Sequence, residues 1–245
     1  MVDALQGELL YERFGEPSVL SVHARAWLAM ALADVGRAGD GIALAEDAVR
    51  IATDARNAFS RTTSHLSLGT VLVRADKLDE GLRVLERSVA LCRDGNFLLL
   101  LPHTASMLGA ALAQAGRLDE ALPLLELAVE TAAAKGLIGG APLYLVRLGH
   151  GVLRAKRGAE ACELARRALD SARQLKERGH EARALHLMGA LAVHGEAPDL
   201  DTARRHYTEA CELARTLGMQ PLVAQCEAAL SALPGPRGAV VDSRR

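Results

Sequence analysis

The chain has 245 residues, half of them hydrophobic but only 3% aromatic, and its formal net charge is −1. Because acidic and basic residues balance, the chain lacks the overall positive charge that favours nucleic acid or an anionic membrane. Its longest apolar stretch, residues 97–101, is too short to span a bilayer, and residues 1–8 do not resemble a signal peptide. We therefore expect a soluble, cytoplasmic protein with no nucleic acid or membrane partner.

A small residue that follows an apolar one returns every 40 positions along the chain. These small residues are Ala29, Gly69, Gly109, Gly149 and Gly189. Two further small positions follow in each copy, and in the fifth copy they are displaced by a two-residue insertion. Self-similarity at such a fixed period indicates an array of stacked units, each unable to bury its apolar faces alone.

Between these positions the apolar residues recur three and four apart, which is the spacing of helices, and Gly-containing turns separate the segments. No segment alternates apolar and polar residues as a strand does. The pattern predicts an all-α solenoid over residues 1–233. In chain order we expect a half-unit at 2–14, then hairpins at about 17–57, 58–96, 97–136, 137–178 and 179–218, a terminal helix at 220–233 and a disordered tail at 234–245.

The small residues explain how the helices of a hairpin pack, since glycine or alanine at a crossing lets two backbones approach closely. The rare aromatic residues Trp27, Phe59 and Tyr144 are expected to fill wider gaps between units. The four cysteines show neither metal-site nor disulfide spacing, and we expect all of them to be free and buried.

The small residues stand at the eighth, twentieth and twenty-seventh positions of each unit, a register that resembles the tetratricopeptide repeat. The units here are longer than the 34 residues of that family. Phrases such as Ala115-Gly116-Arg117-Leu118-Asp119-Glu120-Ala121 and Leu217-Gly218-Met219-Gln220-Pro221-Leu222 also resemble the C-terminal repeat region of bacterial proteins that join a nucleotide cyclase to an AAA-type ATPase. The resemblance implies a right-handed superhelix of about five full repeats with flanking half-repeats. Neither the cyclase nor the ATPase domain is present in this sequence.

The resemblance also implies that the first helix of each hairpin lines a concave groove. Carried over position by position, the expected groove residues are His23, Asp34, Thr63, Leu66, Thr70, Arg74, His103, Ser106, Gln114, Arg147, His150, Arg154, Arg183, His186 and His194. Arg147, His150 and Arg154 share one helical face. Since arginine forks onto carboxylates and phosphates, an acidic peptide, a C-terminal carboxylate or a nucleotide phosphate would suit this half of the groove. The alternative is that these residues form an ordinary solvated helix face.

Chemical sites are not indicated. His186 and His194 lie two helical turns apart, too far to share a metal ion, so we expect no metal and no cofactor. The lysine and asparagine of the carboxylate clamp that binds chaperone tails are absent, and the glycines of residues 136–140 lack the context of a phosphate loop. No nucleophile or paired-carboxylate motif occurs, so an enzyme is not expected.

We interpret the chain as a non-enzymatic scaffold module that binds a protein or peptide, an acidic one being the best match, in a bacterial signalling protein. A second hypothesis is a regulatory sensor that responds to a ligand or peptide within a larger cyclase- or ATPase-type regulator. A third is a structural module that self-associates as a homodimer through its end helices.

Overall fold

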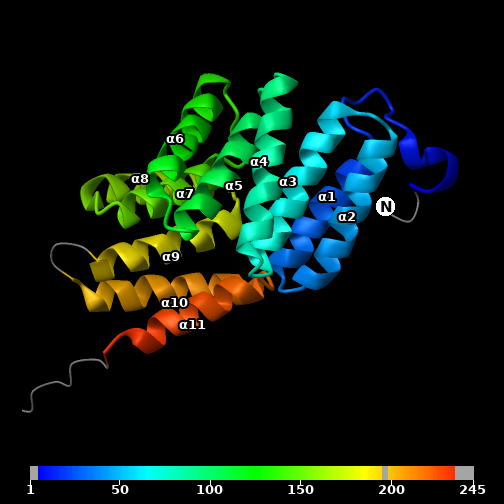
Figure 1. Ribbon diagram of the computed structural model, residues 1–245. Helices are drawn as coiled ribbons and strands as arrows, with labels where there is room; N and C mark the ends of the chain where they lie inside the picture. The colour runs from blue at the N-terminus through cyan, green and yellow to red at the C-terminus, as the bar shows by residue number, and fades with distance from the viewer. Residues whose placement is uncertain (1–4, 195–197, 235–245) are drawn as a thin grey trace, which may run out of the picture.

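The computed structural model describes residues 5–194 and 198–234, and all the regular structure in these ranges is helical (Figure 1). The predicted all-α solenoid is confirmed. After a 3-10 helix, η2 (Gly7–Tyr11), the α-helices are α1 (Leu20–Asp34), α2 (Ala38–Asp54), α3 (Ala58–Arg74), α4 (Leu78–Asp94), α5 (Leu101–Gln114), α6 (Leu118–Ala134), α7 (Ala141–Arg154), α8 (Gly158–Gln174), α9 (Arg178–His194), α10 (Leu200–Thr216) and α11 (Gln220–Ala232).

Consecutive helices pack as antiparallel hairpins, and the first helix of each hairpin also packs against the first helix of the next. The hairpins form a right-handed superhelix, in which α9, α10 and α11 run across the lower part of the molecule and the ends of α10 and α11 come close to the lower ends of α1 and α3 (Figure 1). The curve is tight enough to bring the ends together. A Cβ atom placed on Gly36, in the turn between α1 and α2, would lie only 3.3 Å from Cβ of Gln220 at the start of α11.

Glycines allow the two helices of a hairpin to cross closely. A Cβ atom on Gly109 of α5 would lie 2.8 Å from Cγ of Leu125 and 3.0 Å from the carbonyl oxygen of Ala121, both on α6. Gly69 meets Leu85 in the same way, and Gly189 meets Tyr207. The contacted residue lies 16 positions ahead of Gly69 and of Gly109 and 18 ahead of Gly189, so the crossing absorbs the two-residue insertion. In the fourth hairpin Gly149 instead lies closest to Leu187 of α9, in the next unit.

The helices end in a repeated type of turn. After α1, Gly36 takes a φ of 86°, and the N–H of Arg37 donates to the carbonyl of Leu32 at 2.8 Å. This is the hydrogen bond of a glycine-terminated helix end, which satisfies a carbonyl that the helix leaves open. The same turn recurs with period 40 after α3, α5 and α7, and its positive-φ residues there are Asp76, Gly116 and Lys156.

Small hydroxyl side chains hold α3 close to α1 on the inner side of the curve. Thr63, Ser67 and Thr70 are buried, and the Ser67 hydroxyl donates to the carbonyl of Ala26 at 2.8 Å. The hydroxyls of Thr63 and Thr70 donate to carbonyls one turn back in α3 itself. Because these side chains are short and fully hydrogen-bonded, neighbouring units pack closely on this face, which tightens the superhelix.

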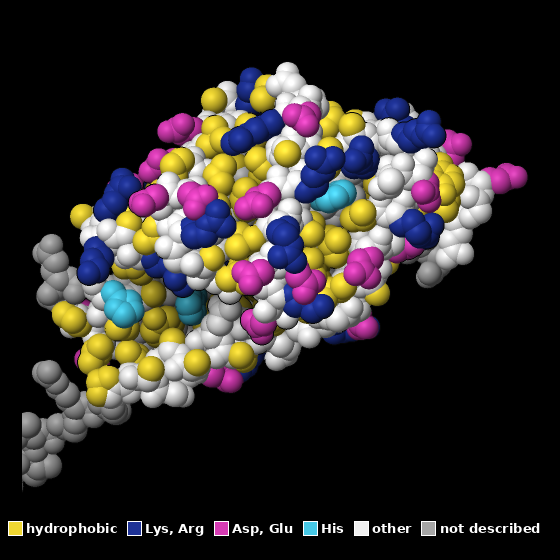
Figure 2. Space-filling view, viewed as in Figure 1, with side chains coloured by type: hydrophobic (Ala, Val, Ile, Leu, Met, Phe, Trp, Pro, Cys, Tyr) yellow, Lys and Arg dark blue, Asp and Glu magenta, His cyan; other side chains and the backbone are white. Residues whose placement is uncertain are grey.

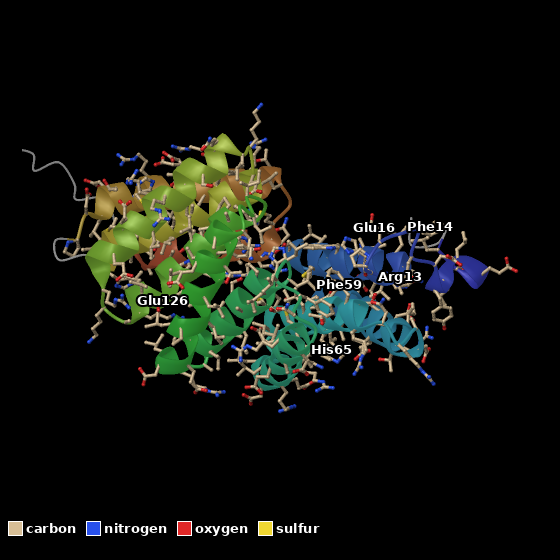
Figure 3. All side chains as sticks on the ribbon, turned by 90° about the horizontal axis from the view of Figure 1, so that it is seen from above. Arg13, Phe14, Glu16, Phe59, His65 and Glu126 are labelled. Atoms are coloured by element: carbon tan, nitrogen blue, oxygen red, sulfur yellow. The ribbon has the colours of Figure 1, made fainter. Side chains whose placement is uncertain are left out.

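Three expectations need correction. The described part of residues 2–14 does not form a hairpin helix, because its only regular element is η2 and Gly7 takes a positive φ. This segment, which carries Phe14, lies at one end of the molecule (Figure 3). Trp27 is 42% exposed instead of filling a gap, and Cys162 is exposed while the other cysteines are buried. The expected tail falls outside the described residues apart from Pro234.

None of the described helices combines the length and the apolar character needed to cross a bilayer.

We predict that Gly109→Ala destabilises the fold by about 1–3 kcal/mol, because the added methyl meets a backbone carbonyl that cannot move aside. Chemical unfolding measures the change. Gly39→Ala is the matched control, since Gly39 also lies in a helix but a Cβ atom there has no neighbour within 4 Å. Its stability should be unchanged or slightly higher, because alanine favours helix more than glycine does. Equal stability of the two variants would contradict the close crossing.

Candidate functional site

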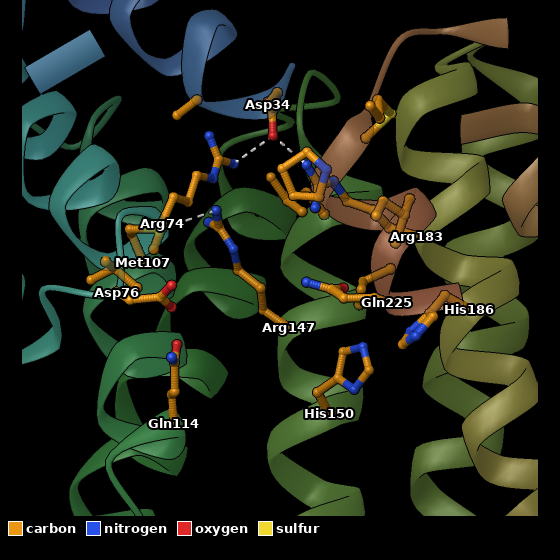
Figure 4. Close-up of a pocket in the computed structure, with 17 residues that line it drawn as sticks. Asp34, Arg74, Asp76, Met107, Gln114, Arg147, His150, Arg183, His186 and Gln225 are labelled. Carbon is orange, nitrogen blue, oxygen red and sulfur yellow. Dashed lines mark hydrogen bonds and ion pairs between the residues drawn. The ribbon is translucent and has the colours of Figure 1, made fainter. Parts of the chain in front are cut away.

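The closed curve of the superhelix encloses a cavity of about 330 Å³ on its inner side, which we call the inner cavity (Figure 4). Its walls come from the first helices of successive units and from the first turn of α11. The lining residues that carry charge or hydrogen-bonding groups are Asp34, Arg74, Asp76, Gln114, Arg147, His150, Arg183, His186 and Gln225. The apolar lining includes Met107, Leu143, Val146, Met219 and Leu222. A space of this size and mixed lining is typical of a small ligand site.

One carboxylate in the inner cavity holds two arginines. Oδ1 of Asp34, at the end of α1, lies 3.1 Å from a guanidinium nitrogen of Arg74 on α3 and 2.5 Å from one of Arg183 on α9 (Figure 4). Arg74 also donates to the carbonyl of Met30 at 3.1 Å. Burial lowers the pKa of Arg74, and the charge of Arg183 lowers it further, while Asp34 opposes both effects. Asp34 and Arg183 are 149 residues apart, so this ion pair ties the two ends of the superhelix together.

Arg147 of α7 brings a third guanidinium to the inner cavity. It donates to the hydroxyl of Ser106 at 2.7 Å and to the sulfur of Met107 at 3.2 Å, both on α5. Among the described residues, no carboxylate lies within ion-pair distance of Arg147. Burial, together with the charges of Arg74 and Arg183, lowers the pKa of Arg147 to about 9. The lining of the inner cavity therefore sets three arginines against two carboxylates, those of Asp34 and of the exposed Asp76, and this excess of positive charge makes it a favourable place for an anion.

A second and larger space of about 1090 Å³, which we call the lateral cleft, opens between the C-terminal ends of α7 and α9 and the start of α8. His150 and His186 border both spaces, with ring centroids 6.1 Å apart. The lateral cleft adds the side chains of Leu153, Arg154, Lys156, Cys162, Leu191 and His194. Figure 2 shows a hollow on the left of the molecule, where histidine side chains lie beside hydrophobic ones.

Aromatic rings form a row from α1 to α7. The ring of Trp27 lies 5.9 Å from that of His23 and 5.7 Å from that of His103, and His103 lies 5.3 Å from Tyr144. The hydroxyl of Tyr144 is hydrogen-bonded to Nδ1 of His103. Burial lowers the pKa of His103 to about 4, with smaller contributions from Arg147 and His180. Burial likewise lowers the pKa of His150 to about 4, helped by His186, Arg154 and Arg183. Both histidines are therefore neutral at neutral pH.

The structure separates the expected groove residues into groups. Those that border the inner cavity are Asp34, Arg74, Gln114, Arg147, His150, Arg183 and His186, and those that border the lateral cleft are His150, Arg154, His186 and His194. Thr63, Leu66, Thr70 and Ser106 border neither space, since they are buried between helices. His23 and His103 belong to the aromatic row. Among the described residues, no three His, Cys, Asp or Glu side chains are arranged to hold a metal ion.

Sequence reasoning did not find the wall that α11 supplies. Met219, Leu222 and Gln225 border the inner cavity because the superhelix closes, and only the accumulated curvature of all units determines that closure. Asp76 and Met107 were also missed. Asp76 occupies the positive-φ turn position after α3, and its 40-residue relation to Gly36 and Gly116 is the one signal that could have drawn attention to it.

Comparison with known proteins identifies the repeats. The family model described as tetratricopeptide repeat matches residues 60–134, which include α4, α5 and α6 and nearly all of α3. Residues 60–134 therefore carry the tetratricopeptide repeat. No curated protein sequence shows significant similarity to it.

Solved structures share the fold of this chain at low sequence identity. RapI in its apo form is 10% identical with a TM-score of 0.66, over 94% of this chain and 85% of that one. A signal transduction ATPase with numerous domains from Pyrococcus horikoshii, which has a tetratricopeptide repeat sensor, is 14% identical with a TM-score of 0.58 over 87% of this chain. The match covers 33% of that ATPase, so the chain spans about a third of its length. A putative kinesin light chain from Podosopora anserina is 20% identical with a TM-score of 0.52, over 86% of this chain and 98% of that one.

We predict that acid destabilises the tetratricopeptide-repeat fold through its buried histidines. The folded-state pKa values of His103 and His150, about 4, lie below the value of 6.5 for an unperturbed histidine. The unfolded chain therefore binds more protons as the pH falls from 6.5 to about 4, and folding loses on the order of 3 kcal/mol for each histidine over this range. Stability from this source is complete above pH 6.5.

Urea unfolding at neutral pH and at about pH 4.5 tests this origin of the acid sensitivity. The double variant His103→Gln and His150→Gln should lose less stability on acidification than the unaltered chain. His194→Gln is the control, because that histidine is exposed at the end of α9. If the double variant and the unaltered chain lose the same free energy, these two histidines are not the source.

Proposed function

We propose that the chain is a non-enzymatic binding module that takes an acidic segment of a protein or peptide into its inner cavity. The observation that carries the proposal is the excess of three guanidinium groups, those of Arg74, Arg147 and Arg183, over two carboxylates, of which only that of Asp34 forms ion pairs with them. A carboxylate or phosphate on the ligand would accept from the donors of Arg147 that face the cavity. Hydrogen bonds between ionised partners are about twice as strong as neutral ones, and enclosure strengthens them.

The remaining lining suits a peptide. Met107, Leu143 and Val146 offer apolar contacts beside the arginines, and the amides of Gln114 and Gln225 offer hydrogen bonds to a peptide backbone. Since His150 and His186 border both spaces, an extended segment with its acidic group at Arg147 would continue into the lateral cleft. There, Leu153 and Leu191 would contact apolar side chains of the ligand.

We also propose that the module serves a signalling protein, in which occupation of the inner cavity informs an attached or associated effector. The repeat phrases at 115–121 and 217–222, which resemble those of bacterial cyclase and ATPase regulators, support this role. The closed curve favours a ligand-responsive sensor over a scaffold with an open groove, because a ligand must change the contacts between the ends to enter or leave. The tetratricopeptide repeat sensor of the Pyrococcus horikoshii ATPase shares the fold and is consistent with this role.

We predict that Arg147→Gln weakens binding of acidic peptides by at least about tenfold, because the variant keeps a polar side chain but loses the charge-assisted hydrogen bonds. Fluorescence anisotropy of a library of short blocked peptides rich in Glu and Leu measures the affinity. Library members with Gln in place of Glu show whether the acidic side chain is recognised.

Arg117→Gln is the matched control for this measurement, since it removes an equal charge from an exposed arginine paired with Glu120 on the outer surface. It should leave affinity unchanged. Circular dichroism should show equal helicity in both variants. Acidic peptides that bind Arg147→Gln as tightly as the unaltered chain would contradict the assignment of the inner cavity.

A further inference from the structure

The two ends of the superhelix meet through very few contacts. The end of α1 reaches α9 through the ion pair of Asp34 with Arg183, and Gly36 in the following turn lies against Gln220 and Pro221 of α11. The interfaces between successive helices are far more extensive. A closure held by one ion pair and one small backbone contact can open at low cost in free energy while every hairpin stays folded.

Asp34 occupies a position that is unfavourable without its arginines. It is the last residue of α1, where the carbonyls of the helix end carry partial negative charge. Its carboxylate is stabilised there by Arg74 from the neighbouring unit and by Arg183 from the far end of the chain. The Asp34 carboxylate thus lies between two arginines of the inner cavity, where an anionic group of a ligand could otherwise bind.

We infer that the ion pair of Asp34 with Arg183 is a latch. An incoming dianionic group releases it by forming ion pairs with Arg183 and Arg147 at the same time. This inference rests on the proposed function of the inner cavity and assigns it a ligand class and a mode of regulation. The ligand group is a phosphate ester or two neighbouring carboxylates. Release of Arg183 frees the end of α1 from α9, and the ends of the superhelix then separate.

The charges on the inner wall determine where the latch breaks. Arg74 donates both to Asp34 and to the carbonyl of Met30, and α1 and α3 belong to adjacent units, so this half of the contact stays in place. The pair of Asp34 with Arg74 is then neutral. Arg147 and Arg183 are then left with two positive charges, because Asp76, the other carboxylate of the wall, is exposed and forms no ion pair with them, and a dianion can pair with both. The contact between α1 and α9 is therefore the one that gives way.

Distance measurement between two spin labels tests the latch without any ligand. Labels replace Arg37, beside Gly36, and Ala228 on α11, both exposed, in a Cys162→Ser background where the other three cysteines are buried. Asp34→Asn and Arg183→Gln should each lengthen or broaden the distance distribution. Asp76→Asn, which removes the same charge from the cavity wall where the structure shows no ion pair, should not. A distribution in Asp34→Asn identical to that of the unaltered chain overturns the latch.

The probes for the second arm are inorganic phosphate and the blocked dipeptide Glu-Glu, with blocked Gln-Gln and potassium chloride of equal ionic strength as controls. Either dianion should lengthen the label distance in the unaltered chain but not in Arg147→Gln. Calorimetry should show that either dianion binds Asp34→Asn about threefold to tenfold more tightly than the unaltered chain, because the Asp34 carboxylate no longer competes for Arg183. Arg147-dependent binding with an unchanged distance overturns the latch and leaves the proposed function standing. A response to phosphate alone assigns a phosphate ester, and a response to Glu-Glu alone assigns paired carboxylates. Absence of Arg147-dependent binding by any acidic probe overturns the proposed function itself.

Discussion

Close backbone contact at the small residues of each hairpin is the constraint on which the rest of this structure depends. Gly69, Gly109 and Gly189 bring the two helices of their hairpins so near that a single methyl group would overlap a neighbouring side chain. Between units, the short side chain of Ser67 on α3 donates to the carbonyl of Ala26 on α1, while the buried Thr63 and Thr70 satisfy their hydroxyls within α3. Units that are narrow on their inner side generate strong curvature when stacked. This curvature brings α11 against the α1–α2 turn and encloses the inner cavity.

Closure also determines the electrostatics of the inner face. An arginine on an open helix face is solvated on most sides, and its interactions contribute little. Once the superhelix closes, Arg74, Arg147 and Arg183 share a space of about 330 Å³ with the carboxylate of Asp34. The cost of burying a guanidinium then depends on how many acceptors surround it. Arg147 has only a hydroxyl and a thioether as acceptors, and burial lowers its pKa to about 9. Under the proposed function, an anionic ligand supplies the charged partner that Arg147 lacks among the described residues.

Much of the fold could be predicted from the sequence because the information is local and repeated. The 40-residue spacing of small residues specifies the crossings, and Gly36, Gly116, Gly136 and Gly218 mark helix ends by their tolerance of positive φ. Asp76 and Lys156 occupy equivalent turns without glycine, so only the period reveals them. The expected helix at residues 2–14 was wrong in its described part, where the short η2 and Gly7 at positive φ stand in place of a regular α-helix.

The candidate site could be predicted only in part. The orientation of Arg147, His150, Arg183 and His186 toward the inner side follows from their positions within a unit, and these residues do border the inner cavity. The ion pair of Asp34 with Arg183 spans 149 residues and depends on the summed rotation of four successive units. A small error in the rotation of each unit would move the two groups apart by many ångströms. No local sequence pattern specifies the total rotation of the units. The residues of the cavity wall can therefore be identified only once the path of the superhelix is known.

The scale of the contact between the ends limits what a ligand can do to it. A ligand shifts a conformational equilibrium only by the difference between its affinities for the two states. If closure depended on an extensive apolar interface, one anionic group could not supply enough binding free energy to open it. Here closure involves one partly exposed ion pair and the approach of Gly36 to Gln220. A bound dianion replaces Asp34 as the partner of Arg183 and so compensates most of the free energy that is lost when the ion pair breaks. The dianion also pairs with Arg147, which has no carboxylate partner among the described residues in the closed state. The balance between the two states is thus within reach of a single charged group, which is the physical requirement for a superhelix that responds to its ligand.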